Sequence, residues 1–148
     1  MTPMTSPAAS VMPRVLRLDD PNGTRGTLLA TRCEACGATN VGLDFSCRNC
    51  ASRHVCAIEC AGLGTLVNYT IVHRAAASWP GAVPYVLGVV TLPEAVELTG
   101  EVVDARAEDL RPGMPVELAL REGGRDPDGR RLIVHKWRPA SPADGRGA

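Results

Sequence analysis

The sequence predicts a mainly β protein, in which a small cysteine-rich unit precedes a closed barrel of five strands. Two Cys-x-x-Cys pairs lie close together before residue 51, a spacing typical of a metal-stapled hairpin. Five runs rich in β-branched residues follow, and strong turn sequences such as "RPGMP" and "EGGRDPDG" separate them. No segment sustains a period of 3.6 residues, so we expect no long helix.

Length and composition indicate one ordinary domain or two small ones. The chain has 148 residues, of which 45% are hydrophobic but only 3% aromatic, so we expect an aliphatic core. Sixteen basic and sixteen acidic residues cancel, which argues against a polyanion binder. No apolar run approaches the roughly 20 residues of a membrane span, and the start lacks a secretory signal pattern. We therefore expect a cytoplasmic protein with reduced cysteines and with neither nucleic acid nor membrane as a partner.

The chain divides into four predicted segments. Residues 1–27 form an irregular N-terminal arm, because residues 1 to about 13 are rich in Pro, Ser and Thr and a "DPNG" turn follows. Residues 28–61 form the cysteine-rich unit, and residues 62–139 form the barrel. Residues 140–148, with the composition "ASPADGRGA", form a disordered tail.

Four cysteines are predicted to hold one structural zinc: Cys33, Cys36, Cys47 and Cys50. A tetrahedral zinc needs four soft ligands, and each Cys-x-x-Cys turn supplies two of them. Four thiolates leave no open position for water, so the metal has no catalytic role. The alternative is a rubredoxin-like iron centre that transfers electrons. We disfavour it because that fold surrounds its metal with the whole chain, whereas these cysteines occupy one end.

The residues around the cysteines fit the same interpretation. Gly37 follows the first pair, where a left-handed turn suits glycine, and Ala51 takes the equivalent place after the second pair. We expect four nearby basic side chains to offset the negative charge of the thiolates: Arg32, Arg48, Arg53 and His54.

Cys56 and Cys60 are predicted to be free thiols that bind no metal. If "HVCAIEC" is a strand, the two residues share a face but lie roughly 13 Å apart along it. A disulfide needs Cα atoms within about 7 Å, so the two cannot bond to each other.

The five barrel strands are predicted at Thr65–His73, Pro84–Leu92, Glu97–Val103, Val116–Arg121 and Arg131–Trp137. Gly88 and Gly100 interrupt two of these runs and indicate bends at barrel corners. The "GLG" at 62–64 lacks a following helix and a Lys-Ser/Thr pair, so we expect a turn into the barrel and no phosphate site. Residues 107–110 fit one helical turn.

No group of residues suggests catalysis by this chain alone. His73 and His135 fall in predicted strands, where each is expected to be a hydrogen-bonded barrel residue. Asp104, Glu108 and Asp109 have the pattern of a solvated turn. We predict no catalytic residue, and the sequence does not show which residues would bind a further cofactor.

The whole pattern resembles the zinc-ribbon/OB-fold accessory proteins of thiolase-like and other acyl-CoA enzymes, which include partners of steroid side-chain aldolases. The similarity covers about residues 28–139. The motifs that carry it are the two cysteine pairs, "GLGTLVNYTIVHRA", the Pro84-Tyr85 pair, "LTGEVV", "RPGMPVEL" and the closing strand Val134–Trp137. The family often begins with a helix, which residues 1–30 lack here, and its second pair usually reads Cys-Pro-x-Cys, whereas this chain has Cys47-Arg48-Asn49-Cys50.

The resemblance implies a rubredoxin-like zinc ribbon followed by a five-stranded OB-fold barrel. It implies a non-catalytic subunit that stabilises a thiolase-like partner, sometimes beside a hydratase-like protein, and helps to bind acyl-CoA at the interface. The partner's reaction is left open between thiolysis, acyl transfer and aldol cleavage.

Two questions stay open at the level of sequence. OB barrels also bind single-stranded nucleic acid through aromatic and basic side chains, but this chain has few aromatics and no net charge. In the loop "SWPGAVP", Trp79 and Val83 either anchor a partner, or Trp79 caps the barrel.

Overall fold

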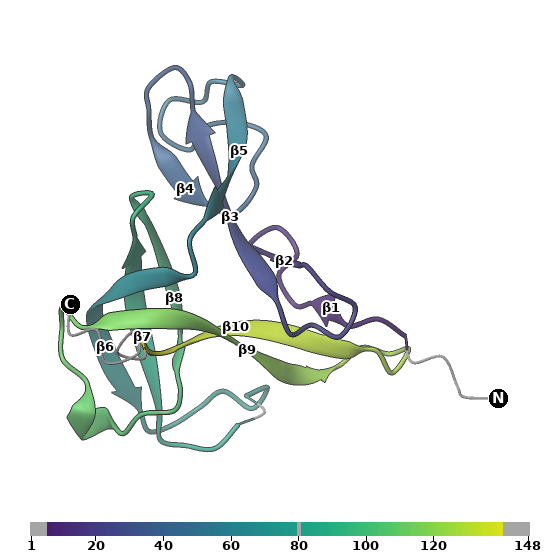
Figure 1. Ribbon diagram of the computed structural model, residues 1–148, viewed down its shortest axis with the longest axis vertical. Coiled ribbons are helices and arrows are strands. Elements are labelled where there is room, and N and C mark those ends of the chain that lie inside the picture. The colour runs from purple at the N-terminus through teal and green to yellow at the C-terminus, as the bar shows by residue number, and fades with distance from the viewer. Residues whose placement is uncertain (1–5, 80, 141–148) are drawn as a thin grey trace.

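A computed structural model describes residues 6–79 and 81–140, and β-strands dominate it (Figure 1). In chain order the strands are β1 (Ala9–Ser10), β2 (Leu16–Leu18), β3 (Gly26–Cys33), β4 (Thr39–Val41), β5 (Val55–Cys60), β6 (Leu63–Val72), β7 (Tyr85–Leu92), β8 (Val96–Val102), β9 (Pro115–Arg125) and β10 (Arg131–Pro139). The helical element of these residues is one 3-10 turn, η1 (Ala107–Asp109), where one helical turn is expected. The mainly β prediction is confirmed. None of the described segments forms a helix with the length and hydrophobicity that a bilayer crossing requires.

The five predicted strands close into an OB-like barrel. Their order is β6-β7-β8-β10-β9, and β9 returns to pair with β6. Strands β8 and β10 run parallel and meet where Trp137 lies opposite Val102, whereas the other neighbours are antiparallel. Each strand overlaps its predicted range, and β9 extends furthest beyond it, to Arg125. Closure pairs the outer strands and leaves the barrel without a long free edge.

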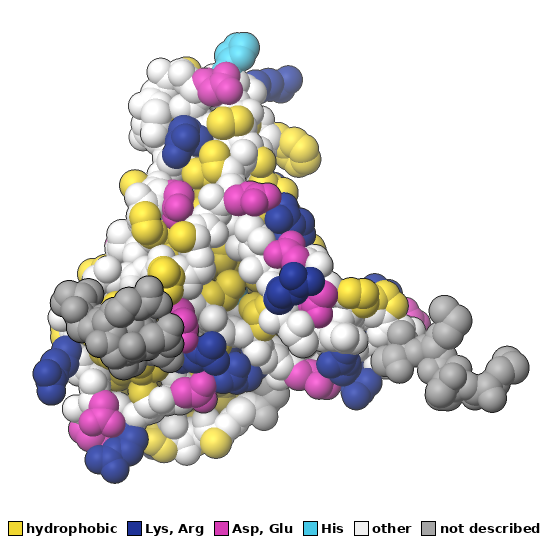
Figure 2. Space-filling view, in the orientation of Figure 1, with side chains coloured by type: hydrophobic (Ala, Val, Ile, Leu, Met, Phe, Trp, Pro, Cys, Tyr) yellow, Lys and Arg dark blue, Asp and Glu magenta, His cyan; other side chains and the backbone are white. Residues whose placement is uncertain are grey.

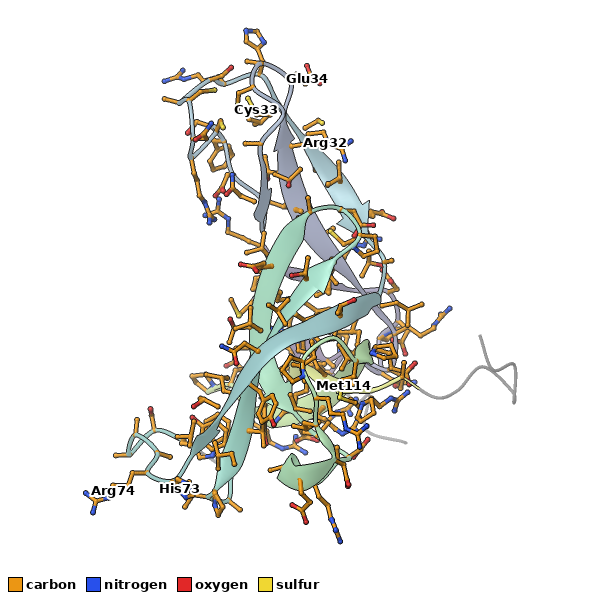
Figure 3. The ribbon with its side chains drawn as sticks, turned by 90° about the vertical axis from the view of Figure 1, so that its left-hand side faces the viewer. Arg32, Cys33, Glu34, His73, Arg74 and Met114 are labelled. Atoms are coloured by element: carbon orange, nitrogen blue, oxygen red, sulfur yellow. The ribbon has the colours of Figure 1, made fainter. Side chains whose placement is uncertain are left out.

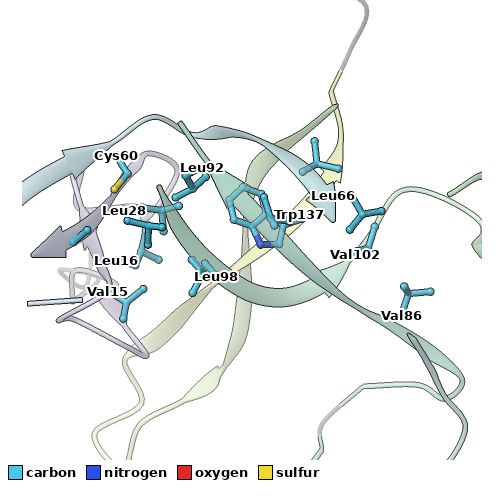
Figure 4. Close-up of a cluster of buried hydrophobic side chains, with 14 of the residues drawn as sticks. Val15, Leu16, Leu28, Cys60, Leu66, Val86, Leu92, Leu98, Val102 and Trp137 are labelled. Carbon is cyan, nitrogen blue, oxygen red and sulfur yellow. The ribbon is translucent and has the colours of Figure 1, made fainter. Parts of the chain in front are cut away.

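The barrel interior is packed around Trp137, which is fully buried (Figure 4). Gly88 on β7 pairs with Gly100 on β8. A Cβ atom on Gly88 would lie 2.8 Å from the side chains of both Leu66 and Val102, and one on Gly100 would lie 3.0 Å from Trp137. The glycines predicted as corner bends are therefore places where neighbouring side chains pack against bare backbone.

A second sheet carries the cysteines. Its central strand β3 pairs with β5 along one edge, and with β2 and then β4 along the other. Leu28 thus lies between β2 and β5, and Ala30 lies between β4 and β5. The end of this sheet that carries Cys33, Cys36, Cys47 and Cys50 is here called the ribbon, and it projects away from the barrel (Figure 1).

The N-terminal arm differs from the irregular segment expected for residues 1–27. Its strand β1 runs parallel to β10, and β2 pairs with the start of β3. The cause is burial: Val15 and Leu16 are 8% and 1% exposed and join the core. Asp20 fixes the following turn by accepting hydrogen bonds from the amides of Thr24 and Arg25, each at 2.8 Å. Residues 1–5, and residues 141–148 of the predicted disordered tail, lie outside the described residues.

One hydrophobic cluster runs from the cysteine-bearing sheet into the barrel, across the expected boundary near residue 61. Leu28 and Cys60 belong to the same buried cluster as Leu92 and Trp137 (Figure 4). Polar contacts close the same junction. The Thr39 hydroxyl donates to the Ala95 carbonyl oxygen at 2.9 Å, and the Ala61 amide donates to a Glu94 carboxylate oxygen at 3.3 Å. The position of the ribbon relative to the barrel is therefore set by packing.

Candidate metal centre and the outer face of the barrel

The four cysteines predicted as ligands come together at the far end of the ribbon. All four sulfur atoms lie within 4.8 Å of one another. Cys33 and Cys50 are 3.6 Å apart between sulfurs, and so are Cys36 and Cys47. A disulfide would be about 2.0 Å long, whereas a zinc ion with four Zn–S bonds of about 2.3 Å spaces its sulfurs about 3.8 Å apart. The geometry therefore fits a tetrahedral metal.

The two Cys-x-x-Cys turns are close copies of each other. In each turn the amides two and three residues after the first cysteine donate to its sulfur: those of Ala35 and Cys36 to Cys33 at 3.3 and 3.4 Å, and those of Asn49 and Cys50 to Cys47 at 3.3 and 3.4 Å. The first cysteine of each pair is buried and the second is exposed. Two chelating turns thus face each other, with one side of the site open to solvent.

Gly37 and Ala51 close the two turns in the same way. Their amides donate to the carbonyl oxygens of Cys33 and Cys47 at 3.0 and 2.9 Å. Both residues have left-handed backbone angles, with φ of 79° and 64°. The left-handed turn expected at Gly37 is present, and Ala51 adopts it despite its Cβ atom.

Hydrogen bonding lowers the pKa of two of the four thiols, Cys33 and Cys36, and so favours the thiolate, the form that binds a metal. The Asn49 side-chain amide, 3.5 Å from the Cys36 sulfur, and the Ala38 amide lower the pKa of Cys36 to about 6. At Cys50 the Ser52 amide also lowers the pKa, but the other thiols and burial outweigh it and raise the pKa to about 12. A metal ion would displace the Cys50 proton on binding.

The basic side chains expected to offset the thiolates do not all serve that purpose. Arg48 instead pairs with Asp44 at 2.7 Å and donates to the Val41 carbonyl oxygen at 3.3 Å. The same Asp44 carboxylate lies 3.4 Å from Arg14. Apart from contacts between the thiols themselves, the hydrogen bonds that the described residues give to the four sulfurs come from main-chain amides and Asn49.

Cys56 and Cys60 lie on β5, opposite Arg32 and Leu28, and both are free thiols, as predicted. Cys60 is 7% exposed. Burial first, and then the charge of Glu94, raise its pKa to about 11. A thiol so hard to ionise is a poor nucleophile, so Cys60 acts as a core residue.

The two histidines have different surroundings. His135 is 6% exposed and donates through Nε2 to the Thr99 carbonyl oxygen at 3.0 Å, as expected for a barrel residue. Its burial lowers the pKa of the imidazole. His73 was expected in the same role, but it follows the end of β6 and is exposed. It lies beside Arg74, at the opposite end of the molecule from Cys33 (Figure 3).

The acidic residues expected to form a solvated turn do so. Asp104 pairs with Arg121 at 2.6 Å. Glu108 and Asp109 pair with Arg106 at 3.0 and 3.7 Å. These carboxylates are therefore exposed members of surface ion pairs.

A second feature, which sequence reasoning missed, is a hollow of about 440 Å³ on the outer face of β7, β8 and β10. Its apolar walls include Trp79, Leu87 and Val134. A half-buried ion pair between Lys136 and Glu101 lies at its edge. The signal was present in the alternation of the strands: Leu87 and Val134 occupy outward positions, where a solvated barrel would carry polar residues.

Trp79 packs within its own loop. Its ring stacks on Tyr85 with centroids 4.0 Å apart and planes 16° from parallel. Its indole nitrogen donates to the Ala82 carbonyl oxygen at 3.4 Å. Val83 remains 47% exposed. Trp79 therefore forms a wall of the hollow, and whether it also contacts a partner stays a prediction.

Comparison with known proteins identifies the family of this chain. A family model described as "ChsH2, C-terminal OB-fold domain" matches residues 57–121. A DUF35 domain-containing scaffold protein of Methanocaldococcus jannaschii is 31% identical over 117 residues, which are 78% of this chain and 83% of that protein. The chain belongs to the DUF35 family. A second DUF35 domain-containing scaffold protein, from Pyrococcus furiosus, is 31% identical over 94 residues, 63% of this chain and 69% of its own.

Among solved structures, this DUF35 protein is similar to a chain of the "Ltp2-ChsH2(DUF35) aldolase". The TM-score is 0.61 with 30% identity, over 78% of this chain and 86% of that chain. The expected resemblance to zinc-ribbon and OB-fold accessory proteins is thereby confirmed. The relatives are named as scaffolds, and the solved assembly is named as an aldolase.

Proposed function

We propose that this DUF35 protein is a non-catalytic scaffold subunit of an acyl-CoA enzyme that forms or cleaves carbon–carbon bonds. The observation that carries the proposal is its similarity, over most of both chains, to a chain of an Ltp2-ChsH2(DUF35) aldolase. The first candidate partner is therefore an aldolase subunit of the Ltp2 type, which we take to be thiolase-like. A hydratase-like protein is a second candidate member of the complex.

The polar groups of the chain support a scaffold. His135 is used in a hydrogen bond to Thr99, and Asp104 is used in an ion pair with Arg121. The four clustered cysteines point to a metal. Groups held in these roles are not free to act as a nucleophile and a base, so the reacting groups would belong to the partner.

We propose zinc as the metal, held by Cys33, Cys36, Cys47 and Cys50. Four thiolates satisfy the tetrahedral preference of zinc and leave no position for substrate, so the ion would stabilise the ribbon. A tetrathiolate also accepts iron, and metal analysis distinguishes the two. Six free thiols agree with a cytoplasmic location, where cysteines stay reduced.

We propose further that the outer hollow helps to hold the acyl part of an acyl-CoA. Its volume of about 440 Å³ is within the usual range for ligand sites, and its walls are largely apolar. The face formed by the second and third strands is also where OB barrels commonly bind ligands. The acyl group, whether steroid or simpler lipid, would be set by the partner.

The same face argues against the alternative of nucleic-acid binding. Bases would need a free aromatic surface, but Trp79 and Tyr85 stack on each other. The Lys136 ammonium is paired with Glu101, and the chain has no net charge. Negligible binding of single-stranded DNA at physiological salt is expected, and micromolar affinity that falls steeply with salt would contradict it.

The test is co-expression with the Ltp2-like and thiolase-like proteins of the same organism. Size-exclusion chromatography should show a complex, and acyl-CoA turnover should require the partner. Retro-aldol, thiolysis and acyl-transfer substrates, assayed in parallel, identify the reaction. A monomer that binds none of these proteins, or a chain that converts acyl-CoA alone, would refute the proposal.

A further inference from the structure

The loop between β4 and the second cysteine pair exposes a phenylalanine to an unusual degree. Phe45 is 89% exposed, more than any other large hydrophobic side chain of the described residues. Its neighbours in the chain are nevertheless fixed. The Asp44 amide donates to the Thr31 hydroxyl at 2.9 Å, and the Cys47 amide donates to the Ser52 carbonyl oxygen at 2.8 Å. The phenyl ring thus projects from a rigid loop.

More apolar surface adjoins this loop. The N-terminal arm exposes Val11 and Met12, each at 44%. A hollow of about 440 Å³ lies between the arm and the loop, with Met12, Val41 and Leu43 among its walls. Hydrophobic side chains reach the surface of the ribbon near Arg side chains (Figure 2). We name this region the Phe45 surface. It consists of Met12, Val41, Leu43 and Phe45 and of a basic rim formed by Arg14 and Arg48.

The rim of the Phe45 surface is basic. Arg14 and Arg48 have side chains that are 60% and 57% exposed. Both contact the same carboxylate, Asp44, which is itself 20% exposed. Two guanidinium groups sharing one carboxylate leave one positive charge at the rim. The Arg14 guanidinium also lies 5.7 Å from the centre of the Phe45 ring. A partner complementary to this rim carries carboxylates.

We propose that the Phe45 surface docks onto the aldolase-type partner, which receives the phenyl ring in an apolar recess bordered by acidic side chains. The inference rests on the proposed scaffold function and names the surface that performs it. Aromatic and arginine side chains dominate protein interfaces, and a ring on a rigid loop loses little conformational freedom on binding. The second cysteine pair begins two residues later at Cys47, so a metal bound by the cluster would help to hold this loop in place.

The experiment measures the affinity of the metal-loaded full chain for the Ltp2-like subunit of the same organism. Phe45→Ala should weaken binding by roughly 30-fold or more, as an interface hot spot does. Its melting temperature and metal content should stay unchanged, because the ring is 89% exposed. Phe45→Trp should retain most of the affinity. Ile71→Ala is the matched control, since Ile71 is an apolar side chain on β6 with 41% exposure, and it should leave binding within about threefold.

The charge of the rim provides a second, independent test. Affinity should fall as salt rises, and Arg48→Gln should reduce that salt dependence. Wild-type affinity in Phe45→Ala, or an equal loss in Ile71→Ala, would overturn the Phe45 surface and leave the scaffold function standing. If Phe45→Ala instead abolished self-association of the isolated chain, the occupant would be a second copy and the inference would be wrong. A wild-type chain that binds no such partner would sink the proposed function and this surface together.

Discussion

Replacing Ala51 by glycine should stabilise the metal-binding end of the protein. Ala51 closes the second cysteine turn with φ of 64°, the same left-handed region that Gly37 adopts in the first turn with φ of 79°. An L-residue in this region costs roughly 1–2 kcal/mol, because its Cβ approaches the following carbonyl oxygen. Glycine avoids that cost but gives the unfolded chain extra freedom worth about 0.4–1 kcal/mol. The expected net gain is about 0.5–1 kcal/mol.

The reverse change, Gly37→Ala, measures the same quantity with the opposite sign. A Cβ atom on Gly37 would have no neighbour within 4 Å, so steric contact adds nothing to the conformational cost. We expect a loss of about 0.5–1 kcal/mol, and a stability close to wild type when the two changes are combined. Because the sites belong to matching turns, the pair isolates the backbone contribution.

Two measurements separate metal binding from general stability. Thermal unfolding of the metal-loaded protein should shift by about 1–4 °C, upward for Ala51→Gly and downward for Gly37→Ala. Competition with a chelator should show metal affinity changed by roughly two- to fivefold in the same directions, since folding of the ribbon and metal binding are linked. Ala95, with φ of 64° in the turn between β7 and β8, is the control. Ala95→Gly should raise the melting temperature without changing metal affinity.

The reasoning would be refuted if Ala51→Gly were neutral or destabilising while Gly37→Ala had no effect. In that case the left-handed turns would not be strained, and the symmetry between the two cysteine pairs would have no energetic meaning.

Four further expectations follow from individual sites. Serine in place of any one cluster cysteine should abolish the single equivalent of zinc and unfold the ribbon; elemental analysis of the wild type showing less than half an equivalent of zinc, with no iron instead, would contradict this. The double variant Cys56→Ser, Cys60→Ser should keep its full metal content, and mass spectrometry of the native protein should find both thiols reduced. Burial depresses the pKa of His135 below its ordinary 6.5, so unfolding takes up a proton and stability should fall as pH drops below about 6.5, with a slope that His135→Gln removes. Gly88→Ala should cost about 1–3 kcal/mol in chemical denaturation because its Cβ would lie 2.8 Å from two core side chains, whereas at Gly62 the same change meets only an ordinary 3.4 Å contact and should be tolerated.

The parts of the fold that sequence reasoning found are those encoded locally. Alternating apolar residues and Gly- or Pro-rich turns located all five barrel strands, because period and turn chemistry are properties of short segments. The cysteine spacing located the candidate metal centre for the same reason. The motif order then indicated the family, which the comparisons confirmed.

The missed features depend on contacts that the fold creates and that no short-range sequence pattern reveals. Strand β1 has two residues and β2 has three, so neither carries a measurable pattern of its own. Strand β1 forms on the edge of the distant strand β10, β2 forms on the edge of β3, and Val15 and Leu16 fill the core. The pairing of Arg48 with Asp44 and the outer hollow of the barrel likewise depend on side-chain positions that only the folded chain defines.

The shared core places the two proposed surfaces in a fixed relation to each other. Leu28 on β3 and Leu92 on β7 belong to one buried cluster, and the bond from Thr39 to Ala95 ties the ribbon to the turn between β7 and β8. A partner docked at Phe45, as proposed, would therefore be held at a fixed position relative to the outer hollow on β7, β8 and β10. If the outer hollow holds an acyl chain as proposed, this arrangement would let a subunit without reacting groups contribute to catalysis, because orienting that chain relative to the partner's residues lowers the entropic part of the barrier. It also explains why a metal with no chemistry of its own would matter: by fixing the loop that carries Phe45, it fixes the geometry between partner and ligand.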